Sequence, residues 1–222
     1  MTDIKKEKTL VIIKPDGIQR SLIGEVIKRY ERTGLKLIAM KMLVPNEDIV
    51  EKHYTVDPAW RMNNGLKTIA NYQAKGLTPP STDPMECSGM TLKKLIKYMS
   101  SGPVIAMVWQ GMHAVGIVRK LTGGTEPLTS DVGTIRGDLT IDSYQVSDID
   151  QRCTRNLVHA SGSADEAEKE IALWFSKDEL IKYNLFNEVV LYETNLDKIL
   201  NLLFLDYFQN CINNLLTIKT IQ

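Results

Sequence analysis

The order of four short apolar runs, and of the amphipathic stretches between them, most limits what this chain can fold into. The runs are Thr9–Ile13, Leu35–Val44, Val104–Trp109 and Asn156–Val158. Each is short, apolar and bounded by turn residues, which is typical of a β-strand. With the helical stretches included, the order is strand, helix, strand, helical connection, strand, helix, strand, helix. This order predicts an α/β (α+β) fold, the ferredoxin-like βαββαβ sandwich with a four-stranded, mostly antiparallel sheet.

The predicted helices are defined by their spacing and their ends. The first carries an apolar stripe from Leu22 to Tyr30, and Ser21 is expected to cap it. Others are predicted from Asn46 to Tyr54, over Thr91–Met99 and over His113–Leu121. The strand Leu35–Val44 is apolar on both faces, so we expect both faces to be covered, one of them by another subunit.

Two insertions and a C-terminal extension lie outside this plan. Residues 57–90 hold many prolines and glycines and are predicted to be an extended connection with little regular structure. Residues 140–155 are predicted to form an extended loop. Apolar residues recur at three- and four-residue spacing between Leu196 and Leu216, which predicts an amphipathic helix that docks on the chain's own core or on a sister subunit. The domains are therefore predicted as 1–193 and 194–222.

Charge and cysteine content exclude several classes of protein. Lys+Arg and Asp+Glu balance at 27 each among 222 residues, so no overall field favours nucleic acid or an anionic membrane. The three cysteines are odd in number and far apart, which indicates reduced thiols in a cytoplasmic compartment. The first residues, MTDIKKEKT, lack the apolar segment of a secretory signal. The polar residues within 196–222 are too frequent for a transmembrane span.

One histidine stands where a phosphate would bind. His159 follows the last predicted strand, and the small residues after it let bulky groups approach its ring. Ser163 and Glu166 form an S-x-x-E capping box that opens a helix. A helix N-terminus with free N–H groups is a natural anion site. An isolated histidine would more often simply pack or cap a turn, so its neighbours decide the interpretation.

Three cations lie at or near the ends of other predicted elements. Lys14 ends the strand Thr9–Ile13, Arg119 lies on the helix His113–Leu121, and Arg136 follows a tight run of small residues. A single lysine or arginine at such a position is more often a surface charge than a ligand-binding residue. Together with His159 they suit phosphoryl transfer, which needs a nucleophile and several cations around the transferred group.

These segments together resemble the nucleoside diphosphate kinase family. The resemblance is carried in the family's order from residue 8 to about 193 by KPDG at 14–17, HY at 53–54, SGPV at 101–104, GTIRGD at 133–138 and NLVHAS at 156–161. It implies transfer of the terminal phosphate of ATP, or another nucleoside triphosphate, to a nucleoside diphosphate through a phosphohistidine. The family forms hexamers, tetramers or dimers, so we expect a homo-oligomer.

The resemblance also implies roles for individual residues. His159 matches the nucleophile, and four residues match positions that grip the phosphates: Lys14, Arg119, Thr125 and Arg136. Asn156 matches a residue at the sugar and phosphate end of the nucleotide. Glu170 matches the glutamate that orients the histidine ring, and Tyr54 matches an aromatic close to it. Mg²⁺ is expected to arrive with the nucleotide, because no carboxylate cluster here forms a dedicated cage.

The chain departs from the family at three places. Gly162 stands where the family usually has aspartate, which puts a water-mediated metal contact in doubt. The insertion 57–90 is much longer than in compact members, and Trp60 is the candidate for their base-stacking aromatic. The loop 140–155 is extended close to the nucleotide end of the site.

Two other functions remain open at this point. The chain could be a family member without turnover that serves as a regulatory or binding module, or a histidine phosphocarrier for a protein partner. The joint presence of Lys14, Arg119, Arg136, Asn156 and His159 weighs against both, because neither function needs the complete set.

Overall fold

The computed structural model describes residues 3–192, 194 and 195, and it contains the predicted four-stranded sheet. The strands are β1 (Glu7–Ile13), β2 (Lys36–Leu43), β3 (Val104–Gly111) and β4 (Val158–Ala160), in the order β2-β3-β1-β4. All three neighbouring pairs are antiparallel. This is the ferredoxin-like order, so the predicted fold class is confirmed.

The predicted helices of the main body occur in the predicted order, together with additional helices, one of them long (15 residues) and the others short. They are α1 (Pro15–Gln19), α2 (Ile23–Glu31), α3 (Glu47–Tyr54), α4 (Trp60–Ala74), α5 (Pro84–Met99), α6 (Ala114–Thr122), α7 (Ile135–Leu139), α8 (Tyr144–Ile149) and α9 (Ala164–Trp174). Short 3₁₀ turns occur at η1 (Ile4–Lys6), η2 (Pro127–Thr129) and η3 (Lys177–Glu179).

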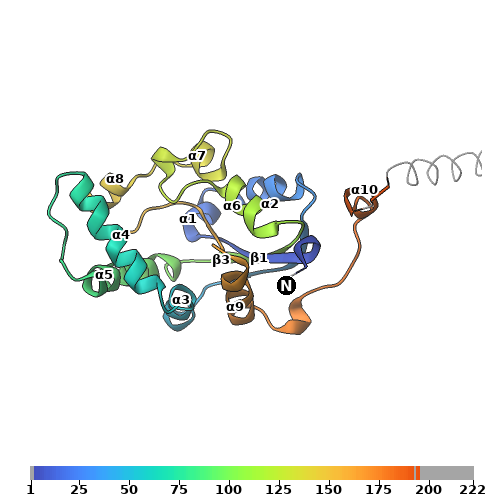
Figure 1. The fold of residues 1–222 in the computed structure, drawn as a ribbon, viewed down its shortest axis with the longest axis horizontal. Helices are drawn as coiled ribbons and strands as arrows, with labels where there is room; N and C mark the ends of the chain where they lie inside the picture. Colours follow the sequence, from blue (N-terminus) through green and yellow to red (C-terminus); the bar gives the residue numbers. More distant parts are fainter. Residues whose placement is uncertain (1–2, 193, 196–222) are drawn as a thin grey trace, which may run out of the picture. The chain divides into compact units, whose positions relative to one another are not determined.

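Helices cover both faces of the sheet, as Figure 1 shows with α2 and α6 above it and α3 and α9 below. Along β1, Val11 and Ile13 join the cluster under α2 and α6, while Leu10 and Ile12 join the cluster of α3 and α9. All four are fully buried. Each fully buried side chain of this size contributes roughly 1.5–3 kcal/mol relative to exposure, so the two clusters fix which face of β1 each residue occupies.

The insertion 57–90 is mostly helical, and our prediction of an extended connection was wrong. It contains α4 and the first turns of α5, which pack against each other. The prolines lie outside these helices or at their start. Pro84 is the first residue of α5, and the Asp83 side chain caps that helix by accepting the Met85 N–H. Gly65 permits the packing, because a Cβ there would lie 1.8 Å from the Pro84 carbonyl oxygen.

Local predictions were wrong at two further places. Ser21 has φ of +58° and caps nothing, since Leu22 is the N-cap of α2. The loop 140–155 contains α8, capped by Ser143 through the Val146 N–H.

The chain divides into two compact units, Met1–Lys182 and Tyr183–Gln222. Within the second unit the described part contains α10 (Glu188–Tyr192). The helix predicted between Leu196 and Leu216 lies outside the described residues, and the predicted boundary at 193 stays a prediction. Among the described helices, none combines the length and apolarity that crossing a membrane requires.

Candidate active site

His159 lies at the centre of strand β4, opposite Ile12 of β1. The sequence predicted a strand at Asn156–Val158 ending before the histidine, but the strand begins two residues later because Leu157 has φ of +63° and cannot continue it. Hydrogen bonds at the next turn fix the strand's end, where Ser161 Oγ accepts the Leu10 N–H at 3.1 Å. His159 is therefore held by the sheet and by the start of α9.

The carboxylate of Glu170 lies directly behind the imidazole. Nε2 of His159 is 2.9 Å from Glu170 Oε1, and Glu170 Oε2 accepts the Ser161 hydroxyl at 2.6 Å. The distance is that of a hydrogen bond, but Nε2 has no partner in well-aligned geometry. We therefore treat it as a close electrostatic contact that orients the ring. Burial raises the pKa of Glu170.

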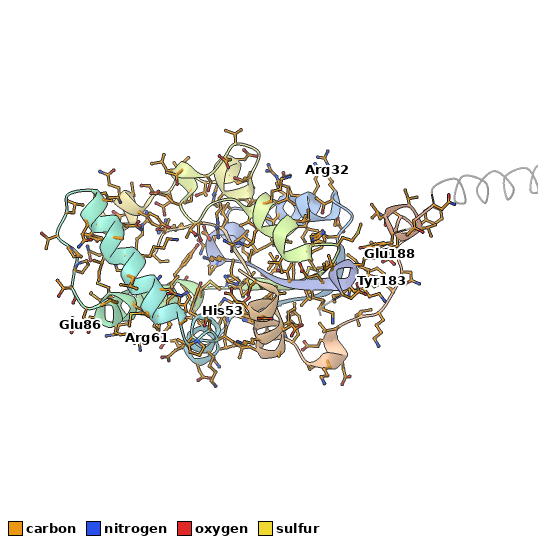
Figure 2. The ribbon with its side chains drawn as sticks, viewed as in Figure 1. Arg32, His53, Arg61, Glu86, Tyr183 and Glu188 are labelled. Carbon is orange, nitrogen blue, oxygen red and sulfur yellow. The ribbon has the colours of Figure 1, made fainter. Side chains whose placement is uncertain are left out.

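A second histidine, which the sequence analysis left unassigned, completes this cluster. The His53 ring lies 4.3 Å from the His159 ring at an interplanar angle of 81°, and His53 Nδ1 accepts the Trp174 indole N–H at 3.3 Å. Burial and the neighbouring His159 lower the pKa of His53 to about 3, so it is neutral at pH 7. Figure 2 labels His53 at α3, beside α9. The packing of α3 on α9 brings it here, and the sequence showed His53 only as part of the HY motif at 53–54, without a role.

Burial and two neighbouring cations keep the nucleophile candidate neutral. The pKa of His159 falls below its ordinary value because the ring is buried and because Lys14 and Arg136 repel a proton there, which outweighs the opposing Glu166 charge. Its side chain still exposes 14% of its surface. The imidazole is thus unprotonated and accessible at pH 7, which a nucleophile requires.

Lys14 and Asn156 form a polar pair at the end of β1. Lys14 Nζ donates to Asn156 Oδ1 at 2.7 Å, and Asn156 Nδ2 donates to the Thr125 carbonyl at 2.9 Å. Burial lowers the pKa of Lys14 to about 8, with Arg136 adding to the effect while Cys153 and Asp16 oppose it. Lys14 therefore remains mostly charged at pH 7.

The two arginines differ in what they contact. Arg136 is buried and donates to the carbonyls of Asn156, Gly123, Gly124 and Val158 at 2.5–3.1 Å. Arg119 is exposed on α6, and within the described residues it makes one long hydrogen bond, 3.4 Å from Nη1 to the Ala160 carbonyl. Arg136 mainly braces the backbone around His159, whereas Arg119 retains most of its N–H groups for a ligand.

The capping box at the start of α9 is only half as predicted. Ser163 Oγ accepts the Glu166 N–H at 3.1 Å, but the Glu166 carboxylate accepts the Gly162 N–H at 2.8 Å instead of that of Ser163. A Cβ at Gly162 would lie 2.5 Å from Glu166 Oε2. The glycine therefore makes room for the Glu166 carboxylate, and an aspartate there would require Glu166 to move.

A single cavity of about 510 Å³ gathers all of the predicted site residues. Those that line it are Lys14, Tyr54, Arg119, Thr125, Arg136, Asn156, His159 and Glu170. One wall comes from α4, which the sequence analysis did not foresee, and includes Trp60, whose ring lies 5.7 Å from that of Tyr54. Among the described residues, the Tyr54 hydroxyl and Asn64 Oδ1 are buried without a hydrogen-bond partner, and both residues line the cavity.

The described residues contain one cluster with metal-ligand geometry, and it does not suit Mg²⁺. His53, His159 and Glu170 offer ligand atoms within 4.8 Å of one another. Two imidazoles and one carboxylate favour transition metals, whereas Mg²⁺ requires six oxygen ligands.

The sequence and the fold match known proteins over most of the chain. The sequence model of the family described as nucleoside diphosphate kinase matches residues 7–70 and 88–180. A nucleoside diphosphate kinase of Pyrobaculum aerophilum is 43% identical over 180 residues, covering 79% of this chain and 98% of the relative.

Two solved structures agree with this match. The crystal structure of an NDP kinase from Pyrobaculum aerophilum has a TM-score of 0.77 at 42% identity, covering 80% of this chain and all of that one. The nucleoside-diphosphate kinase of Borrelia burgdorferi, described as a transition state mimic with bound vanadate and ADP, has a TM-score of 0.69 at 35% identity, covering 84% and 97%. On sequence and fold together, this chain belongs to the nucleoside diphosphate kinase family.

Proposed function

We propose that this chain transfers the γ-phosphate of a nucleoside triphosphate such as ATP to a nucleoside diphosphate by a ping-pong mechanism through phosphorylated His159. The observation that carries the proposal is a neutral, accessible imidazole, backed by Glu170, in a cavity that also holds Lys14 and Arg119. A nucleophile among cations is the arrangement that phosphoryl transfer needs.

The geometry favours Nδ1 as the attacking nitrogen. Nε2 is buried against Glu170, so Nδ1 is the ring nitrogen left for the cavity. In the first half-reaction the Nδ1 lone pair bonds to the γ-phosphorus, and the bond to the bridging oxygen breaks with its electron pair leaving on the diphosphate. In the second, a terminal oxygen of the acceptor diphosphate bonds to phosphorus and the N–P bond breaks. The ring carries positive charge while phosphorylated, and the Glu170 carboxylate stabilises it.

The cations and the polar wall position the nucleotide. Arg119 and Lys14 would stabilise the charge that spreads over the equatorial oxygens, and Thr125 and Asn156 would bind the phosphate and sugar end. Arg136 would act mainly by holding the carbonyls that flank Leu157. Trp60 is proposed to stack on the base, supported by its place on the cavity wall beside Tyr54.

Mg²⁺ is proposed to enter on the nucleotide phosphates. The absence of an oxygen-rich cage around the cavity, among the residues that the structure describes, supports this. When bound, the ion would neutralise phosphate charge. The protein residues provide orientation and the nucleophile.

A homo-oligomer (hexamer, tetramer or dimer) is also proposed. Strand β2 is at an edge of the sheet and exposes Met40, Met42 and Val44, just after it, by 53%, 58% and 64%. Exposed apolar edge strands are usually covered. A cytoplasmic location is supported by Cys87 and Cys153, which are both free thiols.

The test is to incubate the protein with γ-labelled ATP and then with GDP. The expected result is an acid-labile labelled protein whose label passes to GTP, and His159→Ala is expected to abolish it, with kcat reduced by at least about 10³-fold. His113→Asn is the matched control, because His113 is exposed and has φ of +51°, which asparagine tolerates. Label that never reaches GDP would indicate a phosphocarrier, and nucleotide binding without label would indicate a member without turnover.

A further inference from the structure

The backbone turns sharply at Leu157, two residues before His159. Leu157 has φ of +63°, which leucine rarely adopts. The Val158 N–H donates to the Asn156 carbonyl at 2.7 Å, across this one residue. An i to i+2 hydrogen bond around a residue with positive φ is the pattern of the rare, strained γ-turn. Strain of this kind persists only where the surroundings over-determine it.

The turn separates two groups of the site. Asn156, before it, presents its side chain to Lys14, and His159, after it, lies in β4. A relaxed backbone at Leu157 would rotate one group relative to the other. The conformation of this single residue therefore sets the position of the nucleophile relative to the pair that would bind the nucleotide.

Two buried ionic side chains hold the turn from different sides. Arg136 donates to the carbonyls on either side of Leu157, those of Asn156 and Val158. The carboxylate of Asp16 accepts the Leu157 N–H at 3.3 Å, and the Leu157 carbonyl accepts the Lys14 N–H at 2.8 Å. The polar groups of the turn are thus paired, which is what a strained buried backbone requires.

Asp16 is itself fixed by a residue from the end of helix α5. The Tyr98 hydroxyl donates to Asp16 Oδ1, the oxygen that Leu157 does not use. Asp16 exposes only 8% of its surface, so this hydrogen bond replaces lost hydration. The Lys14 ammonium lies 5.4 Å from the centre of the Tyr98 ring, which places a compensating charge nearby.

We propose that Asp16 and Tyr98 are positioning residues of the phosphoryl-transfer site, acting through the Leu157 turn. Neither residue lines the cavity in which the nucleotide is proposed to bind. Their chain of contacts, Tyr98 to Asp16 to the Leu157 N–H, holds His159 and Asn156 in one mutual orientation. This inference rests on the proposed role of His159 as the nucleophile.

The experiment uses three variants and one control. Tyr98→Phe removes the donor to Asp16, Asp16→Ala removes the acceptor for Leu157, and Asp16→Asn retains an oxygen that can accept the Leu157 N–H. Tyr30→Phe is the matched control. The Tyr30 hydroxyl is also buried and forms a hydrogen bond with Thr122 Oγ1 at 2.8 Å, but it does not contact the Leu157 turn.

The measurements are kcat and KM for ATP and GDP, the single-turnover rate of phosphoenzyme formation, and the melting temperature. Misplacing a nucleophile by about 1 Å can cost 10²-fold, so phosphoenzyme formation should slow by on the order of 10-fold in Tyr98→Phe and 10²-fold in Asp16→Ala. KM should stay within roughly twofold because uniform binding is retained. Asp16→Asn should recover part of the rate lost in Asp16→Ala.

A purely structural role predicts a different result. Tyr98→Phe would then lower the melting temperature as Tyr30→Phe does and leave phosphoenzyme formation unchanged, and that outcome overturns the proposal. If Asp16→Ala does not fold, Tyr98→Phe and Asp16→Asn decide the question alone. Wild-type protein that forms no phosphoenzyme refutes the proposed function instead, so the two failures are distinguishable.

Discussion

Nε2 of His159 lies 2.9 Å from Oε1 of Glu170, and both side chains of this pair come from one continuous segment, strand β4 and helix α9. The carboxylate is 1% exposed and is fixed by the Ser161 hydroxyl. It can therefore hold the imidazole in one orientation and respond to positive charge on the ring without solvent reorganisation.

Replacing Glu170 by glutamine should separate these two effects. Glu170→Gln retains a similar shape but removes the negative charge that stabilises the phosphorylated ring, so kcat should fall by on the order of 10–10²-fold. The free energy of unfolding should change little. Burial raises the pKa of Glu170, which means that its negative charge opposes folding, and glutamine does not carry that charge. Steady-state kinetics and thermal unfolding are the measurements, and an unchanged kcat would contradict the role assigned to the carboxylate.

The two arginines should give different phenotypes. Arg119→Ala should lower kcat by on the order of 10²–10³-fold with a nearly unchanged melting temperature, since its N–H groups are mostly available to a ligand. Arg136→Ala should lower both kcat and the melting temperature, because four backbone carbonyls lose their donor. Equal melting temperatures for the two variants would show that the bracing role of Arg136 is wrong.

The pH dependence of activity should follow the two groups whose pKa values are lowered, His159 and Lys14. Because burial and the nearby cations hold the pKa of His159 below its ordinary 6.5, phosphoenzyme formation should persist well below pH 6.5. The pKa of Lys14 is lowered to about 8, so its positive charge disappears as the pH rises through 8 and KM for the nucleotide should rise there. Rapid-quench rates and KM between pH 5 and 10 test this, with Lys14→Gln expected to lose the alkaline dependence.

The lowered pKa of Lys14 also predicts that the free energy of unfolding depends on pH. Between the folded pKa of about 8 and the ordinary value of 10.5, the unfolded chain binds more protons than the folded one. The contribution of Lys14 to the free energy of unfolding should therefore increase with pH across this window. Comparing denaturant unfolding of wild type and Lys14→Gln at pH 7.5 and 10 isolates this contribution, and a difference that is independent of pH would contradict it.

Gly65 should be the sensitive point of the α4–α5 packing. A Cβ there would overlap the Pro84 backbone, which cannot give way as a flexible side chain could, so Gly65→Ala should destabilise the fold by about 1–3 kcal/mol or more. Gly24→Ala is the control, because nothing lies within 4 Å of a Cβ at Gly24 and alanine favours helix α2. Thermal unfolding distinguishes them, and similar shifts for both variants would argue against the close contact.

Residues 196–222 are predicted from their apolar spacing to dock on the protein or on a neighbouring subunit. Deleting them should lower the melting temperature or change the molar mass in solution while leaving phosphoenzyme formation intact. Light scattering and thermal unfolding provide the test. An unchanged mass and melting temperature would mean that the tail is dispensable.

The sequence by itself predicted the order of the four strands and the fold class, and it named eight residues that the fold gathers around one cavity. Apolar runs such as Thr9–Ile13 must be buried whatever their neighbours are, so their pattern specifies strands and faces. Short motifs around Lys14, Arg136 and His159 predicted the chemistry through their resemblance to one family, whose model matches residues 7–70 and 88–180. Each of these signals is local in the chain.

The tertiary structure decided what depends on contacts between distant segments. The prolines of 57–90 predicted an extended connection, yet they lie between or at the ends of helices whose packing depends on Gly65 meeting Pro84. His53 joins His159 only because α3 packs on α9. Leu157 has an unfavourable φ in a turn whose N–H is accepted by Asp16, over a hundred residues earlier, and whose flanking carbonyls are held by Arg136. Packing and buried hydrogen bonds between remote segments outweigh local preference at these positions, so local pattern alone could not predict them.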